Sequence, residues 1–118
     1  MKQLKTFKHA LNGIAHVFKK EQNFKTHIIA TILVITAGIL FSIDKTEWMI
    51  IIIAISIVTA FEIINSAIEY LCDFVSPEYN EKIKHIKDAS AGAVLISAIG
   101  ALVLGLVIFL PRVLDFVL

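Results

Sequence analysis

Three long stretches of this chain carry no charged side chain. The first covers sixteen residues, the second stays uncharged from Trp48 through Phe61, and the third covers twenty-three residues, 89–111. A helix needs about 20 mostly apolar residues to cross the hydrocarbon core of a bilayer, so only the third stretch is long enough by itself. The pattern therefore predicts three membrane-spanning helices, two of which include polar residues near their ends.

The two shorter stretches must be extended to reach full length. His27 and its polar neighbours complete the first span, and the second requires its helix to continue through Glu62 and Asn65 toward Asp73. The predicted spans are about 27–43, 47–74 and 88–111. We therefore expect an all-α integral membrane protein whose residues 1–118 form a single membrane-embedded domain.

A different hydrophobic period precedes the first span. Apolar residues recur there at spacings of three and four, while the lysines lie mostly elsewhere around the helix: Leu4, Phe7, Leu11, Ile14 and Phe18. This spacing predicts a basic amphipathic helix over about 3–20. We expect it to lie in the cytoplasmic headgroup layer, and the alternative is a helix that packs against a soluble partner.

The composition agrees with a membrane protein. The chain is 58% hydrophobic and 18% charged, which is more apolar and less charged than a typical soluble domain. Its single cysteine, Cys72, excludes an internal disulfide. The lysine-rich beginning has no uninterrupted apolar segment, so we expect no signal peptide.

The lysines predict the orientation of the spans. Six precede the first span and three lie between the second and the third, whereas only Lys45 and Arg112 belong to the other side. Because cytoplasmic segments are enriched in Lys and Arg, we expect the N-terminus and the 74–87 connection to be cytoplasmic. The C-terminus is expected outside.

Small residues recur at every fourth position of the third span: Ala89, Ala93, Ser97, Ala101 and Gly105. Such a stripe lets helices approach closely in lipid. Three helices alone would bury the polar face of the second span poorly, so we expect a homo-oligomer.

That polar face holds four residues spaced by three, four and four, and therefore on one side of a helix: Glu62, Asn65, Glu69 and Asp73. Glu62 and Glu69 are separated by about 10.5 Å along the axis at about 1.5 Å per residue. Both cannot bind one Mg²⁺ at about 2.1 Å, so we expect them to have different roles. A second carboxylate for a metal must come from elsewhere, and Glu21 is the only acidic residue among the first 43.

Lys87 and Asp88 stand at the start of the third span, on the same expected side of the membrane. Asp88 could cap the helix and Lys87 could anchor it at the interface. Together with the carboxylates and Asn65, they also supply what a Mg²⁺–nucleotide site requires. No GxxxxGK[ST], HRD or DFG motif is present, so residue patterns alone lead only to a polar interfacial site with metal binding left open.

The tract FEIINSAIEYLCDFVSPEYN, followed by HIKDASAGAVLI, resembles the prokaryotic diacylglycerol kinase family of small integral-membrane lipid kinases. The family's E-x-x-N-[ST]-A-I-E-x-x-x-D motif is filled from Glu62 to Asp73. Its Lys-Asp and Ala-Val pairs correspond to Lys87-Asp88 and Ala93-Val94, and its upstream E-x-x-[FM]-[RK] element begins at Glu21.

The resemblance implies a homotrimer with an N-terminal surface helix in each subunit and active sites between neighbouring subunits. It implies ATP- and Mg²⁺-dependent phosphorylation of a lipid hydroxyl, with Glu62 as general base and Glu21 and Glu69 as metal ligands. It further implies ATP contacts from one group of residues: Asn65, Glu78, Tyr79, Asn80, Lys87 and Asp88. No nucleic-acid partner is expected.

The family has two branches that differ in their lipid acceptor. FKKEQNF, the TEW before the second span and the AGAVL and IFLP segments are more similar to the undecaprenol branch of the family than to the diacylglycerol branch. His27 also stands where diacylglycerol kinases tend to have an acidic residue. We therefore expect an undecaprenol kinase in the bacterial cytoplasmic membrane, with diacylglycerol kinase as the alternative.

Two other classes of membrane protein also contain polar residues within their spans. An ion-coupled transporter subunit predicts polar residues through the whole membrane depth, but the outer halves of the three spans lack charge. A purely structural oligomer leaves the polar face of the second span without a reason.

Overall fold

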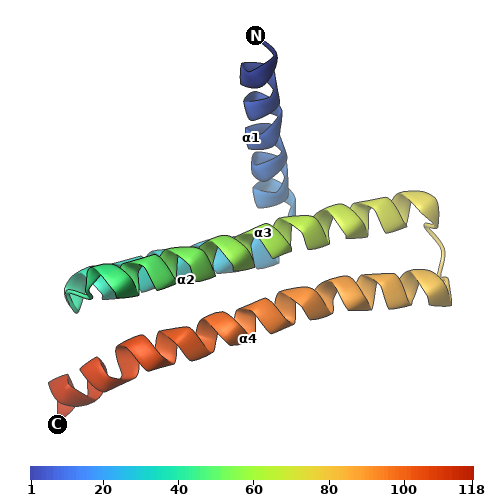
Figure 1. Ribbon diagram of the computed structural model, residues 1–118. Coiled ribbons are helices and arrows are strands. Elements are labelled where there is room, and N and C mark those ends of the chain that lie inside the picture. Colours follow the sequence, from blue (N-terminus) through green and yellow to red (C-terminus); the bar gives the residue numbers. More distant parts are fainter.

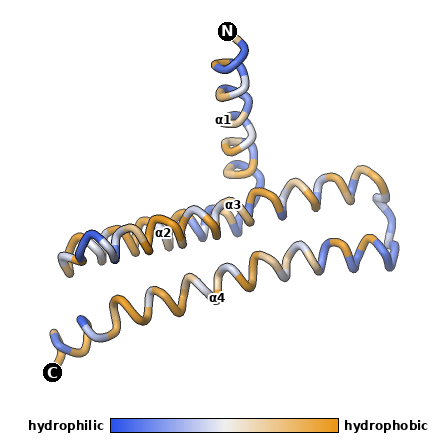
Figure 2. Tube along the Cα trace, in the orientation of Figure 1, coloured by the Kyte–Doolittle hydropathy of each residue, from blue (hydrophilic) through white to orange (hydrophobic).

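The computed structural model describes residues 1–118 as four helices: α1 (Lys2–Lys20), α2 (Gln22–Leu40), α3 (Lys45–Val75) and α4 (Glu81–Val117). α3 and α4 form a long antiparallel hairpin, α2 lies beside α3, and α1 projects crosswise from the other three (Figure 1). By length and hydropathy, α2, α3 and α4 are each able to cross a membrane. Figure 2 shows their hydrophobic middles and the hydrophilic connection between α3 and α4.

The chain changes direction between α1 and α2 at a single residue. Glu21 has an extended backbone (φ −108°, ψ 115°) between two helices. Phe24, one turn later, is 2% exposed and meets Phe18 of α1 edge-on, with ring centroids 6.3 Å apart. This aromatic contact fixes where α2 starts relative to α1.

At the other end of α2, a short turn leads into α3. Ser42 has a positive φ of 52°, and Asp44 and Glu47 then form a capping box in which each side chain accepts the other residue's backbone N–H. Glu47 also accepts two hydrogen bonds, of 2.5 and 2.6 Å, from Arg112 of α4. One side chain therefore starts α3 and ties it to the far end of α4.

The protein core is small and lies near this end of the hairpin. Ile43, Ile51 and Ile108 are its buried centre, with Trp48 and Phe109 among the partly buried residues around it. Ile108 is the only buried residue of α4. Most apolar side chains of the long helices thus face outward, as expected where lipid or other subunits surround them.

α4 begins earlier than the predicted span. Asn80 caps it by accepting from the backbone N–H groups of Lys82 (2.9 Å) and Ile83 (3.3 Å). Asp88 lies two turns inside the helix and pairs with Lys84 at 2.7 Å. The alternative in which Asp88 caps this helix is therefore wrong, because the polar residues from 81 to 87 extend the helix beyond its apolar part.

α4 also continues past its proline. Pro111 lies inside the helix, which ends only at Val117. Proline has no N–H to donate to the preceding turn. The carbonyl that loses its donor is that of Val107, and at the next position the Arg112 guanidinium donates to the carbonyl of Ile108 at 2.9 Å.

Candidate active site

The half of α3 nearest the 76–80 turn carries the polar face predicted from the sequence. Glu62 is 6% exposed and is the only buried acidic or basic residue of the chain. Asn65 and Glu69 follow one and two turns later and are only partly buried. On this face, a buried carboxylate is thus followed toward the turn by partly buried polar groups.

Glu62 has one side-chain partner, His27 of α2. The Nε2 of His27 lies 2.8 Å from Oε1 of Glu62, with the His27 side chain 29% exposed. Sequence reasoning considered His27 as part of the first span and in relation to the lipid branch, and did not connect it to Glu62. A signal was available, because both residues are polar groups near the same predicted end of neighbouring spans.

Asn65 connects α3 to α4. Ser90 donates its hydroxyl to Asn65 Oδ1 at 2.6 Å, and Asn65 Nδ2 donates to Glu69 Oε1 at 3.5 Å. Because Ser90 engages the amide oxygen, the amide N–H₂ is turned toward Glu69. Ser90 was missed from sequence, where it was only one position in a small-residue segment.

Glu21 is brought to the same region of α3. Tyr70, the residue after Glu69, donates its hydroxyl to Glu21 Oε1 at 3.0 Å. Tyr70 was not predicted as a site residue, and nothing in its sequence position pointed to Glu21. The two predicted metal ligands, Glu21 and Glu69, thus belong to one neighbourhood although 48 positions separate them.

The donor set fits a magnesium ion that arrives with a nucleotide. No group of three or more His, Cys, Asp or Glu side chains is gathered for a metal. Mg²⁺ is commonly held by one or two carboxylates together with phosphate oxygens and water. Glu21 and Glu69 can supply the two carboxylates, and the remaining ligands would come from the nucleotide and solvent.

Lys87 lies across the α3–α4 interface. Its Nζ is 2.5 Å from Asp73 Oδ1, and both side chains remain accessible. Asp88 pairs instead with Lys84 of its own helix. The predicted nucleotide-binding lysine is therefore on the same end of the hairpin as Glu69, whereas the Asp88 carboxylate is already engaged elsewhere.

The three predicted residues of the turn are less closely tied to the site. Glu78 and Tyr79 are exposed, and the Asn80 side-chain oxygen caps α4. No hydrogen bond joins them to Glu62, Asn65 or Glu69 within one chain. The structure does not bring these turn residues together with the polar face.

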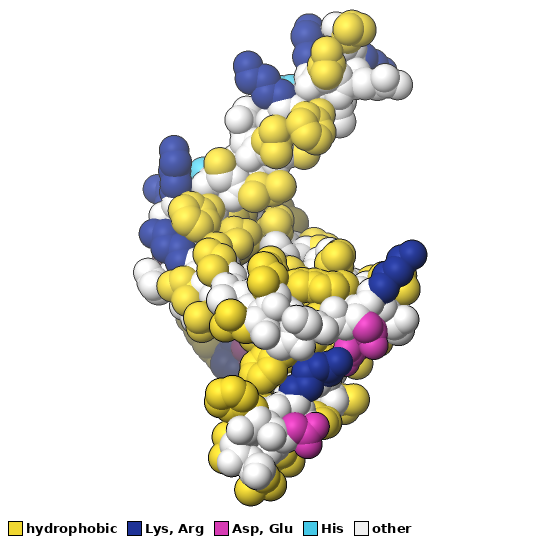
Figure 3. All heavy atoms as spheres, turned by 90° about the vertical axis from the view of Figure 1, so that its left-hand side faces the viewer, with side chains coloured by type: hydrophobic (Ala, Val, Ile, Leu, Met, Phe, Trp, Pro, Cys, Tyr) yellow, Lys and Arg dark blue, Asp and Glu magenta, His cyan; other side chains and the backbone are white.

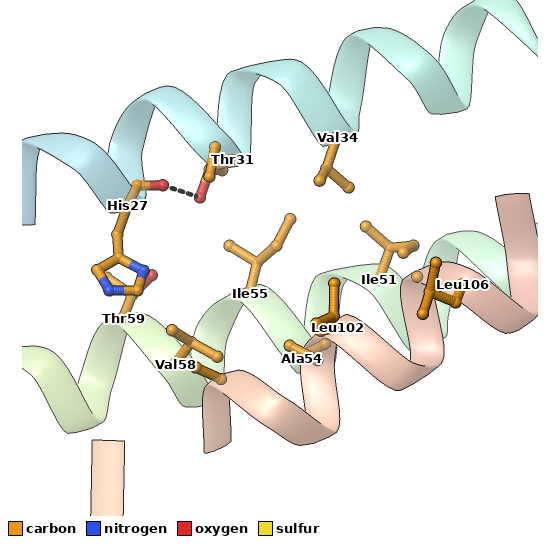
Figure 4. A pocket seen from close by; sticks show the side chains of 14 residues that line it. His27, Thr31, Val34, Ile51, Ala54, Ile55, Val58, Thr59, Leu102 and Leu106 are labelled. Atoms are coloured by element: carbon orange, nitrogen blue, oxygen red, sulfur yellow. Dashed lines mark hydrogen bonds between the residues drawn. The ribbon is translucent and has the colours of Figure 1, made fainter. Parts of the chain in front are cut away.

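An apolar cleft lies between α2, α3 and α4 beside Glu62. It has a volume of about 310 Å³, and ten of its fourteen lining residues are hydrophobic. Figure 4 shows His27 and Thr59 at one end of it, with Val34, Ile51 and Leu106 toward the other. The polar end of the cleft therefore includes the histidine that contacts Glu62.

Comparison with known proteins identifies the family. The family model for prokaryotic diacylglycerol kinase matches residues 8–109. This chain belongs to that family. Its three apolar helices and its family point to a bacterial membrane protein.

The relatives agree in chemistry but differ in acceptor. The chain is 38% identical to an undecaprenol kinase of Bacillus subtilis over 92% of its own length and 88% of the relative's. It is 33% identical to a diacylglycerol kinase of Synechocystis over 95% of its length and 65% of that protein, and 28% identical to one of Escherichia coli over 85% and 82%. The protein is a lipid kinase, as the resemblance predicted.

Proposed function

We propose that this lipid kinase transfers the γ-phosphate of ATP to the hydroxyl of undecaprenol at the cytoplasmic face of the membrane. The observation that carries the proposal is the buried Glu62 in contact with His27, which lines the polar end of an apolar cleft. A lipid alcohol needs both features, because its chain must stay in an apolar environment while its hydroxyl meets a base. The greater identity to the undecaprenol kinase favours undecaprenol as the acceptor.

In this mechanism Glu62 is the general base. Its carboxylate accepts the proton of the lipid hydroxyl while the hydroxyl oxygen forms a bond to the γ-phosphorus. The bond from that phosphorus to the bridging oxygen breaks, and the electron pair leaves with ADP. Undecaprenyl phosphate and ADP are the products.

The more accessible residues would bind the metal ion and the nucleotide. Glu21 and Glu69 would hold Mg²⁺, which offsets the charge of the phosphate oxygens when bound. Asn65 and Asp88 would contact or support the ATP, and Lys87 would exchange Asp73 for a phosphate oxygen. The turn residues would meet the nucleotide: Glu78, Tyr79 and Asn80.

The membrane orientation follows from the same scheme, because ATP is cytoplasmic. The N-terminus and the α3–α4 turn would face the cytoplasm, with the spans at about 27–43, 47–74 and 88–111. α1 would lie in the headgroup layer, which agrees with its crosswise direction and with the lysines along one edge of it in Figure 3.

A cysteine reporter at Lys45 should react with an impermeant reagent from outside and one at Lys82 should not. The opposite labelling pattern would refute this orientation.

We further propose a homotrimer whose active sites are shared between subunits. α4 has a single buried residue among 37, and its small-residue stripe makes close helix contacts possible. The number three comes from the family resemblance. Detergent-corrected mass measurement of the purified protein would check it.

Diacylglycerol is the second candidate acceptor, since two of the compared relatives carry that name. The deciding experiment gives purified protein in detergent Mg²⁺, labelled ATP and either lipid, and compares kcat/KM. We expect the higher value for undecaprenol. A higher value for diacylglycerol would overturn the acceptor, and transfer to neither lipid by folded trimeric protein would overturn the proposed kinase reaction.

A further inference from the structure

His27 has no role in the mechanism above, although it is the only side chain within ion-pair distance of Glu62, with Nε2 2.8 Å from Oε1. We propose that His27 is a positioning residue for the general base, an inference that rests on the proposed function. In this proposal the close approach of Nε2 to Glu62 Oε1 lets the Nε2–H donate to that oxygen in the reacting enzyme and hold it in place. The other carboxylate oxygen, Oε2, is then left for the lipid hydroxyl.

The burial of Glu62 explains why a partner is needed. A carboxylate that is removed from water and left without a hydrogen bond is strongly destabilised. The backbone N–H groups of α3 around Glu62 are used within the helix, so the partner must be a side chain. His27 approaches from α2, with Nε2 2.8 Å from Oε1, and a partner fixed at that place would also select one orientation of the carboxylate.

His27 is itself held in place by its own helix. Phe24, one turn earlier, is buried against Phe18 of α1, and the hydroxyl of Thr31, one turn later, donates to the His27 carbonyl at 2.9 Å. The orientation of the base is therefore set by α2, whereas the base belongs to α3. His27 also lines the cleft (Figure 4), so the residue that contacts the carboxylate also faces the proposed path of the acceptor.

During transfer, the hydroxyl proton moves to Oε2 of Glu62 and the Nε2 proton stays on His27. His27 thus contributes through geometry and takes no part in the exchange of bonds. A displacement of about 1 Å in a reacting group can cost about 100-fold in rate. Loss of the hydrogen bond should accordingly lower kcat and leave ATP binding almost unchanged.

The test compares two substitutions of similar length. His27→Gln keeps an N–H donor at the end of the side chain, whereas His27→Met keeps the size and lacks the donor. We expect His27→Met to lower kcat by about 10- to 100-fold with the KM for ATP within about two-fold, and His27→Gln to recover most of the loss. His9→Ala, at an exposed histidine of α1, is the matched control and should behave as wild type.

A double-substitution cycle completes the test. In a Glu62→Gln background, His27→Met should cause little additional loss, because the base that it positions is already absent. Equal kcat values for His27→Gln and His27→Met, or a change in the KM for lipid alone, would overturn the proposal.

Wild-type protein in the same assay separates this inference from the proposed function. If undecaprenol is not phosphorylated and diacylglycerol is, the acceptor is wrong and the His27 variants are compared on diacylglycerol. If neither lipid is phosphorylated, the proposed function and the role of His27 fail together.

Discussion

Replacing Glu62 and Glu69 one at a time should produce two different defects. The residues occupy one helix, about 10.5 Å apart along its axis at about 1.5 Å per residue. Two oxygens bound to the same Mg²⁺ at about 2.1 Å are at most about 4.2 Å apart. In the structure the two carboxylates also have different partners, since Glu62 contacts His27 and Glu69 accepts from Asn65, so we expect each to act on a different part of the reaction.

For Glu62→Gln we expect a loss of kcat with nucleotide binding retained. Glutamine preserves the size of the side chain and an oxygen that can accept from His27, so the buried site keeps its packing and its hydrogen bond. The base itself is lost. General-base catalysis contributes about 10²- to 10⁴-fold, or about 3 to 5 kcal/mol of transition-state stabilisation.

For Glu69→Gln we expect weaker binding of Mg²⁺–ATP. This residue is partly accessible and does not contact the proposed base, but its carboxylate is one of the two proposed metal ligands. The apparent Mg²⁺ requirement should rise at least tenfold, and saturating Mg²⁺ should restore part of the activity.

Both variants are measured by steady-state transfer from labelled ATP across a Mg²⁺ series, together with nucleotide binding by a fluorescent ATP analogue. Thermal unfolding in detergent controls for folding. Identical kinetic defects in the two variants would refute the division of roles. Recovery of Glu62→Gln by added Mg²⁺ would refute it equally.

Two further predictions concern packing. Gly38→Ala should lower the unfolding temperature, because a Cβ there would lie 2.7 Å from the Trp48 ring and such overpacking costs about 1–3 kcal/mol. Gly13→Ala, with open space around it, is the control in thermal unfolding. Equal stability of the two variants would contradict the prediction. Val34→Phe should fill part of the cleft and raise the KM for the lipid several-fold without changing the KM for ATP. Leu33→Phe, on the exposed side of α2, should leave both KM values unchanged. If steady-state kinetics gave the same KM for the lipid in both variants, the lipid would not bind in this cleft.

Much of the architecture was predictable from composition and period. Uncharged stretches interrupted by charged segments predicted three apolar helices, and the three- and four-residue spacing near the N-terminus predicted a helix that closely matches α1. Helix ends were less predictable. α4 gained its early start from an Asn80 cap and continued through Pro111 to Val117, so neither end coincided with a boundary of the uncharged stretch.

The sequence by itself determined the positions of Glu62, Asn65 and Glu69 on one face, because helical geometry sets the angle between residues of a single element. It also determined the family, through motifs that lie within continuous segments. The partners of these residues were decided only by the tertiary structure. His27, Ser90 and Tyr70 belong to contacts between residues that are far apart in the chain or on different helices, and such contacts depend on how helices pack, which periodicity along one helix does not specify.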